Sequence, residues 1–172
     1  MCSVVVWCIC SPGPSCWALT PDELVAWQAA INELLEHNPR YRYGAHITER
    51  PEDPKDCSGS LFWAARKAGF PVKRTTAARM MWGDDGWSGY PVVYVDGGAG
   101  DLIGFLMQPR SRDVDHIGAL IVHIAIDGDG TGETTMAHAS VARGFSRATM
   151  TNMANDYWYR RLSHVWRLEF NR

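Results

Sequence analysis

A cysteine placed where a helix should begin is the strongest candidate nucleophile in this chain. Cys57 directly follows Asp56, a residue type favoured at helix N-caps. Unpaired backbone N–H groups and the positive end of the helix dipole meet at such a position. They are expected to lower the pKa of the thiol, favour the nucleophilic thiolate and stabilise an oxyanion. The small neighbours Ser58, Gly59 and Ser60 leave the thiol approachable, and a buried structural cysteine is the alternative interpretation.

Two histidines are candidates for the base that a thiol nucleophile needs and for the group that orients that base. His116 stands at the start of an expected strand, and His138 lies on the expected return strand, so a hairpin would bring both into one sheet. His123 is the rival for the orienting role. Side chains alternate along a strand, so on an unbulged strand His123 faces away from His116, which favours His138. The remaining histidines are interpreted as surface or core residues: His37, His46 and His164.

Helix signals are confined to the first half of the chain. Thr20 is an N-cap, Pro21 takes the first helical position and Glu23 completes a capping box, with apolar residues following at helical spacing. A second helix is predicted over residues 56–69, and a short third one over residues 76–81. The nucleophile therefore opens the second helix.

Strand signals fill the second half of the chain. Strands are predicted over residues 92–95, 102–106, 117–126, 133–139 and 165–170, with a hairpin turn at residues 127–132 and a loop at residues 83–89. Helices first and an antiparallel sheet afterwards indicate an α+β fold.

Composition limits the classes of protein to which the chain can belong. Its 172 residues fit one domain, and 46% hydrophobic with 21% charged residues exclude a disordered or fibrous chain. The net charge of −2 gives no indication of nucleic-acid binding. The longest apolar run covers residues 4–10 and is far shorter than the roughly 20 residues that a membrane span needs.

The other four cysteines crowd into the first sixteen residues. Cys2, Cys8, Cys10 and Cys16 do not form the evenly spread set of a disulfide framework. A metal site from three of them lacks a fourth ligand at a suitable spacing, so residues 1–19 are interpreted as a flexible lead-in. No standard export signal is expected there, because the first basic residue is Arg40.

The end of the chain is locally basic. Residues 141–172 contain six arginines against Asp156 and Glu169, an excess of four positive charges. A solvated face is the simpler interpretation, and attraction of an anionic polymer is the alternative.

Several short motifs resemble, in their order, those of the NlpC-type peptidoglycan endopeptidases, which are papain-like cysteine peptidases of bacterial cell walls. The segment Asp56-Cys57-Ser58-Gly59 resembles their nucleophile motif. The order and approximate spacing agree over residues 38–140, through Tyr41-Arg42-Tyr43-Gly44, Gly100-Asp101-Leu102-Ile103, His116-Ile117-Gly118 and His138-Ala139-Ser140.

The resemblance implies a papain-like catalytic domain over residues 20–172 and a role for each site residue. Cys57 would attack a peptide carbonyl, His116 would act as general base and His138 would orient it. Tyr41 would line the site near the oxyanion, together with Asp56 and Ser58.

The resemblance also implies a substrate and a place of action. The bond cleaved would join D-γ-glutamate to a diamino acid in the stem peptides of peptidoglycan, with no metal or cofactor. The protein would be a monomer that acts at the cell wall, in the periplasm or outside the cell, for example as a phage or prophage lysin.

Three alternatives remain open at this stage. The same residues suit an N-acetylmuramoyl-L-alanine amidase or an acyltransferase of papain-like fold, and a third alternative is a non-catalytic wall-binding module. The loop over residues 44–57 and the hairpin between the two histidines are longer than is typical of the family, which leaves the third catalytic position open.

Overall fold

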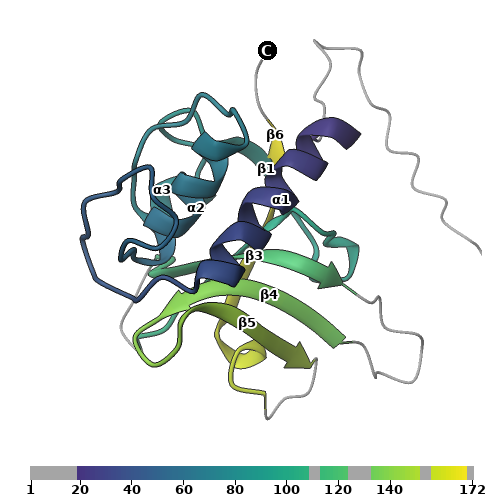
Figure 1. Cartoon of the computed structure of the whole chain (residues 1–172). Coiled ribbons are helices and arrows are strands. Elements are labelled where there is room, and N and C mark those ends of the chain that lie inside the picture. Colours follow the sequence, from purple (N-terminus) through teal and green to yellow (C-terminus); the bar gives the residue numbers. More distant parts are fainter. Residues whose placement is uncertain (1–18, 109–112, 124–132, 152–155, 170–172) are drawn as a thin grey trace, which may run out of the picture.

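A layer of helices covers one face of an antiparallel sheet. A computed structural model describes residues 19–108, 113–123, 133–151 and 156–169, and within them it contains three α-helices and six strands. The helices are α1 (Pro21–His37), α2 (Cys57–Lys67) and α3 (Ala77–Met81), and they lie together above the sheet in Figure 1. All three begin where the sequence predicts, and the α+β fold is confirmed.

The sheet brings distant segments of the chain together. Its strands follow the spatial order β1-β6-β2-β3-β4-β5, and every neighbouring pair is antiparallel. The strands are β1 (Ser88–Val92), β2 (Leu102–Phe105), β3 (His116–His123), β4 (Glu133–Ser140), β5 (Gly144–Thr151) and β6 (Leu162–Glu169). The short 3-10 helices η1 (Tyr94–Asp96) and η2 (Tyr159–Arg161) precede β2 and β6.

Local capping explains where the first helix begins and ends. The Thr20 hydroxyl accepts a hydrogen bond from the Glu23 backbone N–H at 3.3 Å, and the Glu23 carboxylate accepts one from the Thr20 backbone N–H at 2.8 Å. Asn38 ends the helix in a left-handed conformation (φ = 43°). The buried side chains of α1, such as Trp27 and Leu34, point to the sheet.

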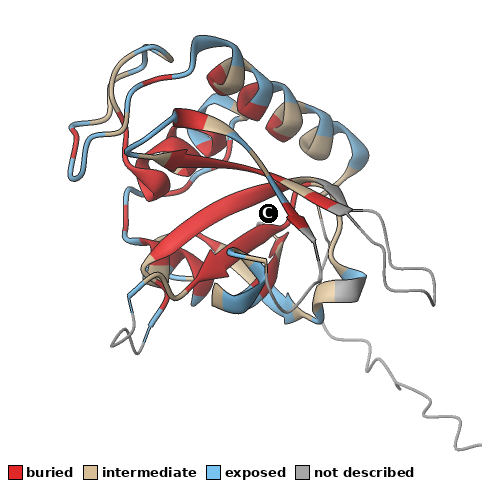
Figure 2. Ribbon diagram, turned by 90° about the horizontal axis from the view of Figure 1, so that it is seen from below, coloured by how far each residue is buried: buried red, intermediate tan, exposed pale blue. Residues whose placement is uncertain are grey.

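Each face of the sheet has its own hydrophobic core. The larger core lies between the helices and the sheet and includes Leu61, Ile117 and Ala137. The smaller core lies on the opposite face, where Phe105 and Met136 pack with Trp158 and other residues. Figure 2 shows the same distribution, because burial is concentrated in the strands and on the inner sides of the helices.

The Gly-Asp-Leu segment at the start of β2 has a structural role. The Asp101 carboxylate accepts hydrogen bonds from Arg167 at 3.2 and 3.1 Å and from the Gly98 N–H at 2.8 Å. Gly100 has φ = 101°, and a Cβ there would lie 2.5 Å from Leu24 Cδ1. Glycine is therefore required for close contact with α1.

One strand prediction is wrong, and one strand was missed. Residues 92–95 are mostly a 3-10 turn rather than a strand, because β1 starts earlier, at Ser88, within the segment expected to be a loop. The strand β5 was not predicted, because its sequence alternates few apolar residues with polar ones along an edge of the sheet. The expected lead-in, apart from Leu19, and the hairpin turn at residues 127–132 lie outside the described residues.

Candidate active site

Asp56 organises the first turn of α2. Its carboxylate accepts a hydrogen bond from the Gly59 N–H at 2.6 Å as the N-cap, and another from the Gly44 N–H at 3.0 Å. A Cβ at Gly59 would lie 2.6 Å from Ile47 Cδ1 and 2.8 Å from the Asp56 carboxylate, so glycine is needed for this packing. The predicted N-cap is confirmed, and it ties the helix to the preceding loop.

Arg74 neutralises the buried Asp56 and was not found from the sequence. Its guanidinium donates hydrogen bonds of 2.7 and 2.8 Å to the two carboxylate oxygens. It also donates to the Ser58 hydroxyl at 2.7 Å and to the Thr75 carbonyl. Ser58 is buried, and its hydroxyl is thus part of this network. Arg74 uses Nη2 for both carboxylate oxygens and Nη1 for Ser58 and Thr75, so these charge-assisted bonds hold the start of α2 in place.

The Cys57 thiol is buried and is the nucleophile candidate at the start of this helix. It is 8% exposed. Burial raises the pKa of the Cys57 thiol, and the Asp56 carboxylate adds to that effect. Backbone N–H groups of Ile117 and Ser58 point to the sulfur and act in the opposite direction, but they do not outweigh burial. The expected lowering of the pKa is therefore wrong, and the resting thiol is protonated at neutral pH.

The two predicted histidines lie in direct contact. His116 Nε2 lies 3.0 Å from His138 Nδ1, and the ring centroids are 5.2 Å apart. The backbone of His138 pairs with that of Gly118, two residues after His116. A Cβ at Gly118 would lie 3.3 Å from His138 Cβ and 2.8 Å from the Ala137 carbonyl oxygen, so glycine leaves room at this point.

Trp158 and Phe105 form an apolar wall around the histidine pair. Trp158 stacks on His116 with ring centroids 5.7 Å apart and meets His138 edge-on at 4.6 Å. Phe105 packs against both His116 and Trp158. Trp158 was not found from the sequence, because nothing in the locally basic tail indicates that its segment returns to the sheet.

This apolar wall keeps both imidazoles neutral. Burial lowers the pKa of His116 to about 3, and the neighbouring His138 adds to that effect. Burial, helped by the charge of Arg143, lowers the pKa of His138 to about 4. At neutral pH the site thus holds a neutral thiol and two neutral imidazoles.

Cys57 and His116 both lie near the start of β3, but they pack on opposite faces of the sheet. The backbone N–H of Ile117, the residue directly after His116, acts on the Cys57 thiol in the direction that lowers its pKa. Cys57 packs in the core on the helix side, whereas the His116 ring packs with Phe105 on the other face. Among the described residues, no hydrogen bond joins the thiol directly to the His116 ring. Catalytic hydrogen bonds are often longer without substrate and shorten in the complex.

Tyr41 lies where two cavities meet. One cavity, of about 1010 Å³, is lined by Cys57, Ser58, Asp56 and Arg74, and the other, of about 620 Å³, is lined by His116 and His138. Tyr41, Gln108 and Asp115 line both. Burial raises the pKa of the Tyr41 hydroxyl, with additions from Cys57 and Asp56, so this hydroxyl keeps its proton and remains a donor. Tyr41 thus lines the same cavity as Cys57, and its role near the oxyanion stays a prediction.

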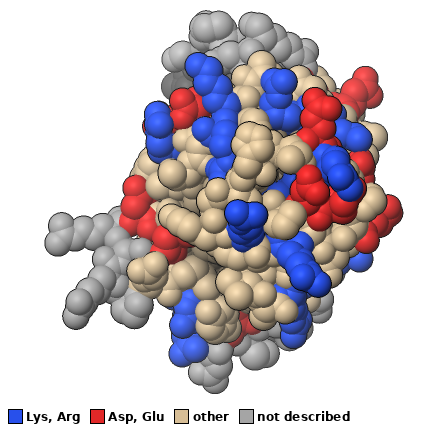
Figure 3. Space-filling model, turned by 60° about the vertical axis from the view of Figure 1, so that its left-hand side comes forward, with Lys and Arg blue, Asp and Glu red and all other residues tan. Residues whose placement is uncertain are grey.

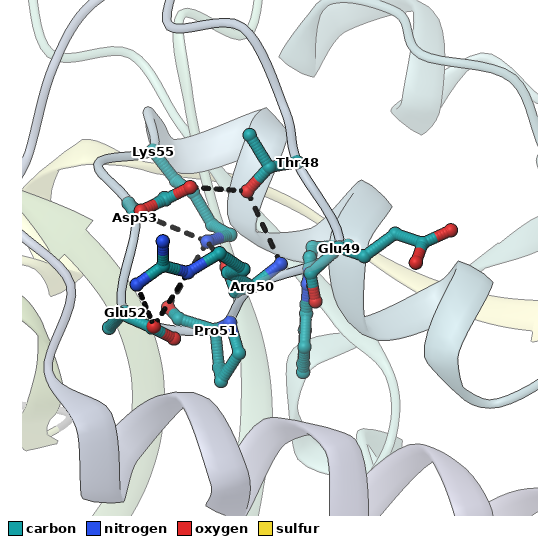
Figure 4. Close-up of polar contacts among 8 residues, drawn as sticks. Thr48, Glu49, Arg50, Pro51, Glu52, Asp53 and Lys55 are labelled. Carbon is teal, nitrogen blue, oxygen red and sulfur yellow. Dashed lines mark hydrogen bonds and ion pairs between the residues drawn. The ribbon is translucent and has the colours of Figure 1, made fainter.

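A buried lysine supports the loop that leads to Cys57. Lys55 is 1% exposed, and its ammonium donates hydrogen bonds to the carbonyl oxygens of Arg50, Pro51 and Asp53 at 2.8, 3.1 and 2.8 Å (Figure 4). It also lies 5.6 Å from the centre of the Trp63 ring. The backbone of Lys55 pairs with that of Tyr41. Lys55 therefore supports the site in two ways. Its backbone holds Tyr41, and its side chain holds the loop that leads directly to Asp56 and Cys57.

The argument against His123 needs correction, although its backbone position excludes it. β3 has a register shift between Leu120 and Val122, so the strand is not regular and the expected alternation does not hold. The backbone of His123 pairs with Thr134 near the far end of β3, seven residues and roughly 20 Å along the strand from His116. His37, His46 and His164 are exposed.

The described residues do not indicate a metal centre or a membrane span. They contain no group of three histidine, cysteine or acidic side chains placed to hold a metal ion. No described helix is long and apolar enough to cross a bilayer. The four cysteines of the first sixteen residues lie outside the described residues.

Comparison with known proteins supports the fold. No protein-family model matches the chain, and no curated protein matches its sequence. Among solved structures, the fold is similar to that of a Staphylococcus aureus subsp. aureus Mu50 protein described as similar to a lipoprotein of the NLP/P60 family, with a TM-score of 0.60 and 22% identity. The match covers 92% of this chain and 45% of that one, so the chain spans less than half of the protein it resembles.

Proposed function

We propose that this protein is a cysteine peptidase of the NlpC type that cleaves peptidoglycan stem peptides between D-γ-glutamate and a diamino acid. The observation that carries the proposal is the hydrogen-bonded pair of His116, at the start of β3, and His138, on β4. The residue after His116, Ile117, acts through its backbone N–H on the Cys57 thiol at the start of α2. Their order along the chain and the shared fold favour the same chemistry.

The proposed mechanism begins with neutral partners. His116 must carry its proton on Nε2, donated to His138 Nδ1, because only this tautomer leaves Nδ1 of His116 free to accept the thiol proton. As the sulfur attacks the carbonyl carbon, His116 takes that proton and becomes an imidazolium, which His138 stabilises. The backbone N–H of Cys57 and the Tyr41 hydroxyl are the donors we assign to the oxyanion.

The second half of the proposed reaction returns the site to its starting state. The imidazolium protonates the departing amine, which leaves the D-glutamyl γ-carbonyl as a thioester on Cys57. A water molecule gives a proton to His116 and attacks the thioester, and the thiol and a free γ-carboxylic acid are released.

The direct test combines two variants with an analysis of products. Purified stem peptide is incubated with the wild type, Cys57→Ala and His116→Ala, with His164→Ala as the control because it is an exposed histidine outside both cavities. We expect loss of cleavage only in Cys57→Ala and His116→Ala, with far-UV circular dichroism unchanged in all variants. Cleavage by Cys57→Ala would contradict the proposal.

Mass spectrometry of digested walls distinguishes the other enzymes. A new free amine on the diamino acid supports the proposed bond, whereas release of an intact stem peptide indicates an amidase. The proposal also places the protein at the cell wall, in the periplasm or outside the cell. Delivery as a phage or prophage lysin, or by a secretion machine, fits that location.

A further inference from the structure

The two cavities that meet at Tyr41 differ in how their positive charges are compensated. The cavity on the Cys57 side is lined by Arg74 and Arg79. Arg74 is paired with Asp56, and Arg79 is paired with Asp84 at 3.0 Å and with Asp85 at 3.2 Å. Both positive charges on this side are therefore neutralised by the protein itself.

The cavity on the histidine side is lined by two arginines that have no acidic partner among the described residues. Arg143 lies in the turn between β4 and β5, and Arg147 lies on β5. Both side chains are exposed, and among the described residues neither forms an ion pair. The charge of Arg143 reaches the His138 ring, whose pKa it helps to lower.

The acidic residue in this cavity is already engaged. The Asp115 carboxylate accepts hydrogen bonds from the backbone N–H groups of Met107 at 2.6 Å and Gln108 at 3.2 Å. Figure 3 shows a related imbalance on one face of the molecule, where the charged side chains of the lower part are mostly basic. The two arginines outnumber the single Asp115 carboxylate in the lining of the histidine-side cavity, so an excess of positive charge remains to bind an anion.

The arginines of the locally basic tail differ in whether they lie at the histidine-side cavity. Arg167 is held by Asp101, and Arg161 lies over the Tyr157 ring and donates to the Tyr157 carbonyl. Arg160 is exposed and lines neither cavity. Only Arg143 and Arg147 of the described tail arginines therefore border the histidine pair, in a cavity of about 620 Å³ that suits a short peptide better than a polymer.

We propose that Arg143 and Arg147 bind a carboxylate of the substrate beside the scissile bond, an inference that rests on the proposed function. Guanidinium groups match a carboxylate with paired hydrogen bonds. A γ-linked D-glutamate keeps its α-carboxylate free, a few bonds from the carbonyl that is attacked. A diamino acid with a second carboxyl group is the other source of the same chemistry, on the other side of the bond.

The test uses four synthetic stem peptides and five proteins. The peptides carry both carboxylates, an amide in place of the glutamate α-carboxylate, an amide in place of the diamino acid side-chain carboxylate, or both amides. The proteins are the wild type, Arg143→Gln, Arg147→Gln and the double variant, with Arg160→Gln as a control for loss of one positive charge in the same segment. KM and kcat are measured for each combination.

We expect the double variant to raise KM for the free acid about tenfold or more, with kcat nearly unchanged, because the lost contact binds substrate and transition state alike. One amidated peptide should raise KM for the wild type to a similar extent and should show no further loss with the double variant. That peptide identifies which carboxylate is bound. Arg160→Gln should match the wild type.

Several outcomes separate failure of this inference from failure of the proposed function. Equal KM values for all four peptides with the wild type would overturn the carboxylate site and leave the peptidase intact. Variants that weaken binding to whole walls without changing peptide kinetics would overturn it in favour of a polymer-binding face.

Binding to Cys57→Ala, measured by calorimetry, gives a readout that needs no turnover. Tighter binding of the free acid than of the amides, lost in Arg143→Gln/Arg147→Gln/Cys57→Ala, supports the carboxylate site even if the wild type cleaves none of the peptides. In that case the proposed function would fail while the site remained. Equal binding of acid and amides would overturn the site.

Discussion

His138 presents its Nδ1 to Nε2 of His116 at 3.0 Å, and this contact fixes which nitrogen of His116 remains for the thiol. An acceptor at this position orients the ring and stabilises the imidazolium that forms during attack. We expect His138→Asn, whose Oδ1 can replace the acceptor, to retain kcat/KM within about tenfold. His138→Leu, which removes the acceptor, should lose about 100-fold or more. Equal losses in the two variants would show that His138 acts only by packing.

The protonated state of the Cys57 thiol can be measured by alkylation. Because burial raises its pKa, iodoacetamide should react slowly at pH 7.5, and the rate should still be rising above the ordinary thiol pKa of about 8.5. Peptide mass spectrometry separates Cys57 from the four N-terminal cysteines. His116→Ala should leave the inflection in place, since a neutral imidazole cannot stabilise a thiolate. An inflection of the alkylation rate below pH 8 would contradict a resting state in which the Cys57 thiol and the His116 imidazole are both neutral.

Acid should destabilise the fold through the histidine pair. The pKa values of His116 and His138 are about 3 and about 4 in the folded protein, below the ordinary value of 6.5. The unfolded chain therefore binds more protons between pH 6.5 and 4, and the free energy of unfolding should fall as pH falls through that window. The slope is at most about 1.4 kcal/mol per pH unit for each histidine. Urea titrations at several pH values measure it.

The matched variants separate this effect from general acid sensitivity. His138→Gln should reduce the pH slope because one titrating group is gone, whereas His37→Gln, which removes an exposed histidine at the end of α1, should leave it unchanged. An unchanged slope in His138→Gln would show that other groups control acid unfolding.

Arg74 and Arg79 offer a matched pair of exposed arginines, one bound to a buried carboxylate and the other to more exposed ones. Arg74→Met leaves the buried Asp56 carboxylate without its charged partner and should lower the free energy of unfolding by about 2 kcal/mol. Arg79→Met breaks exposed pairs and should cost less than about 1 kcal/mol. Thermal and urea unfolding compare the two. Similar losses would mean that the Asp56–Arg74 pair does not hold the start of α2.

The lead-in should be dispensable up to a defined residue. Leu19 packs against the core on the helix side, so deletion of residues 1–18 should leave both activity and stability unchanged. Deletion through residue 19 should keep the activity and cost about 1 kcal/mol of stability, because part of a leucine side chain is lost from the core. Loss of activity in either truncation would contradict the interpretation of this segment.

Local signals were sufficient for the helices and for the choice of candidate residues. Thr20 and Asp56 cap helices through hydrogen bonds to residues three positions later, and short sequence motifs predict such contacts. The pairing of His116 with His138 followed from one hairpin, although the bulge in β3 showed that the argument against His123 rested on an alternation the strand does not keep.

The contacts that set the chemistry of the site are long-range and were not predictable in this way. Arg74 reaches back 18 residues to Asp56, and Trp158 covers a histidine 42 positions earlier in the chain. Neither contact produces a short motif in the sequence from which it could be predicted. The direction of the Cys57 pKa was mistaken for the same reason, because the helix N-terminus is visible in the sequence and the packing that buries the sulfur is not.

The oxygen cage around Lys55 has a consequence for the conditions in which the loop keeps its shape. Backbone carbonyl oxygens are among the ligands with which protein loops bind dissolved cations. Here three such oxygens bind the ammonium of Lys55 instead. A tethered ammonium cannot diffuse away and is not exchanged when the mineral content of the surroundings changes. The loop that carries Asp56 and Cys57 is therefore held by a cation that belongs to the chain itself and needs no ion from solution.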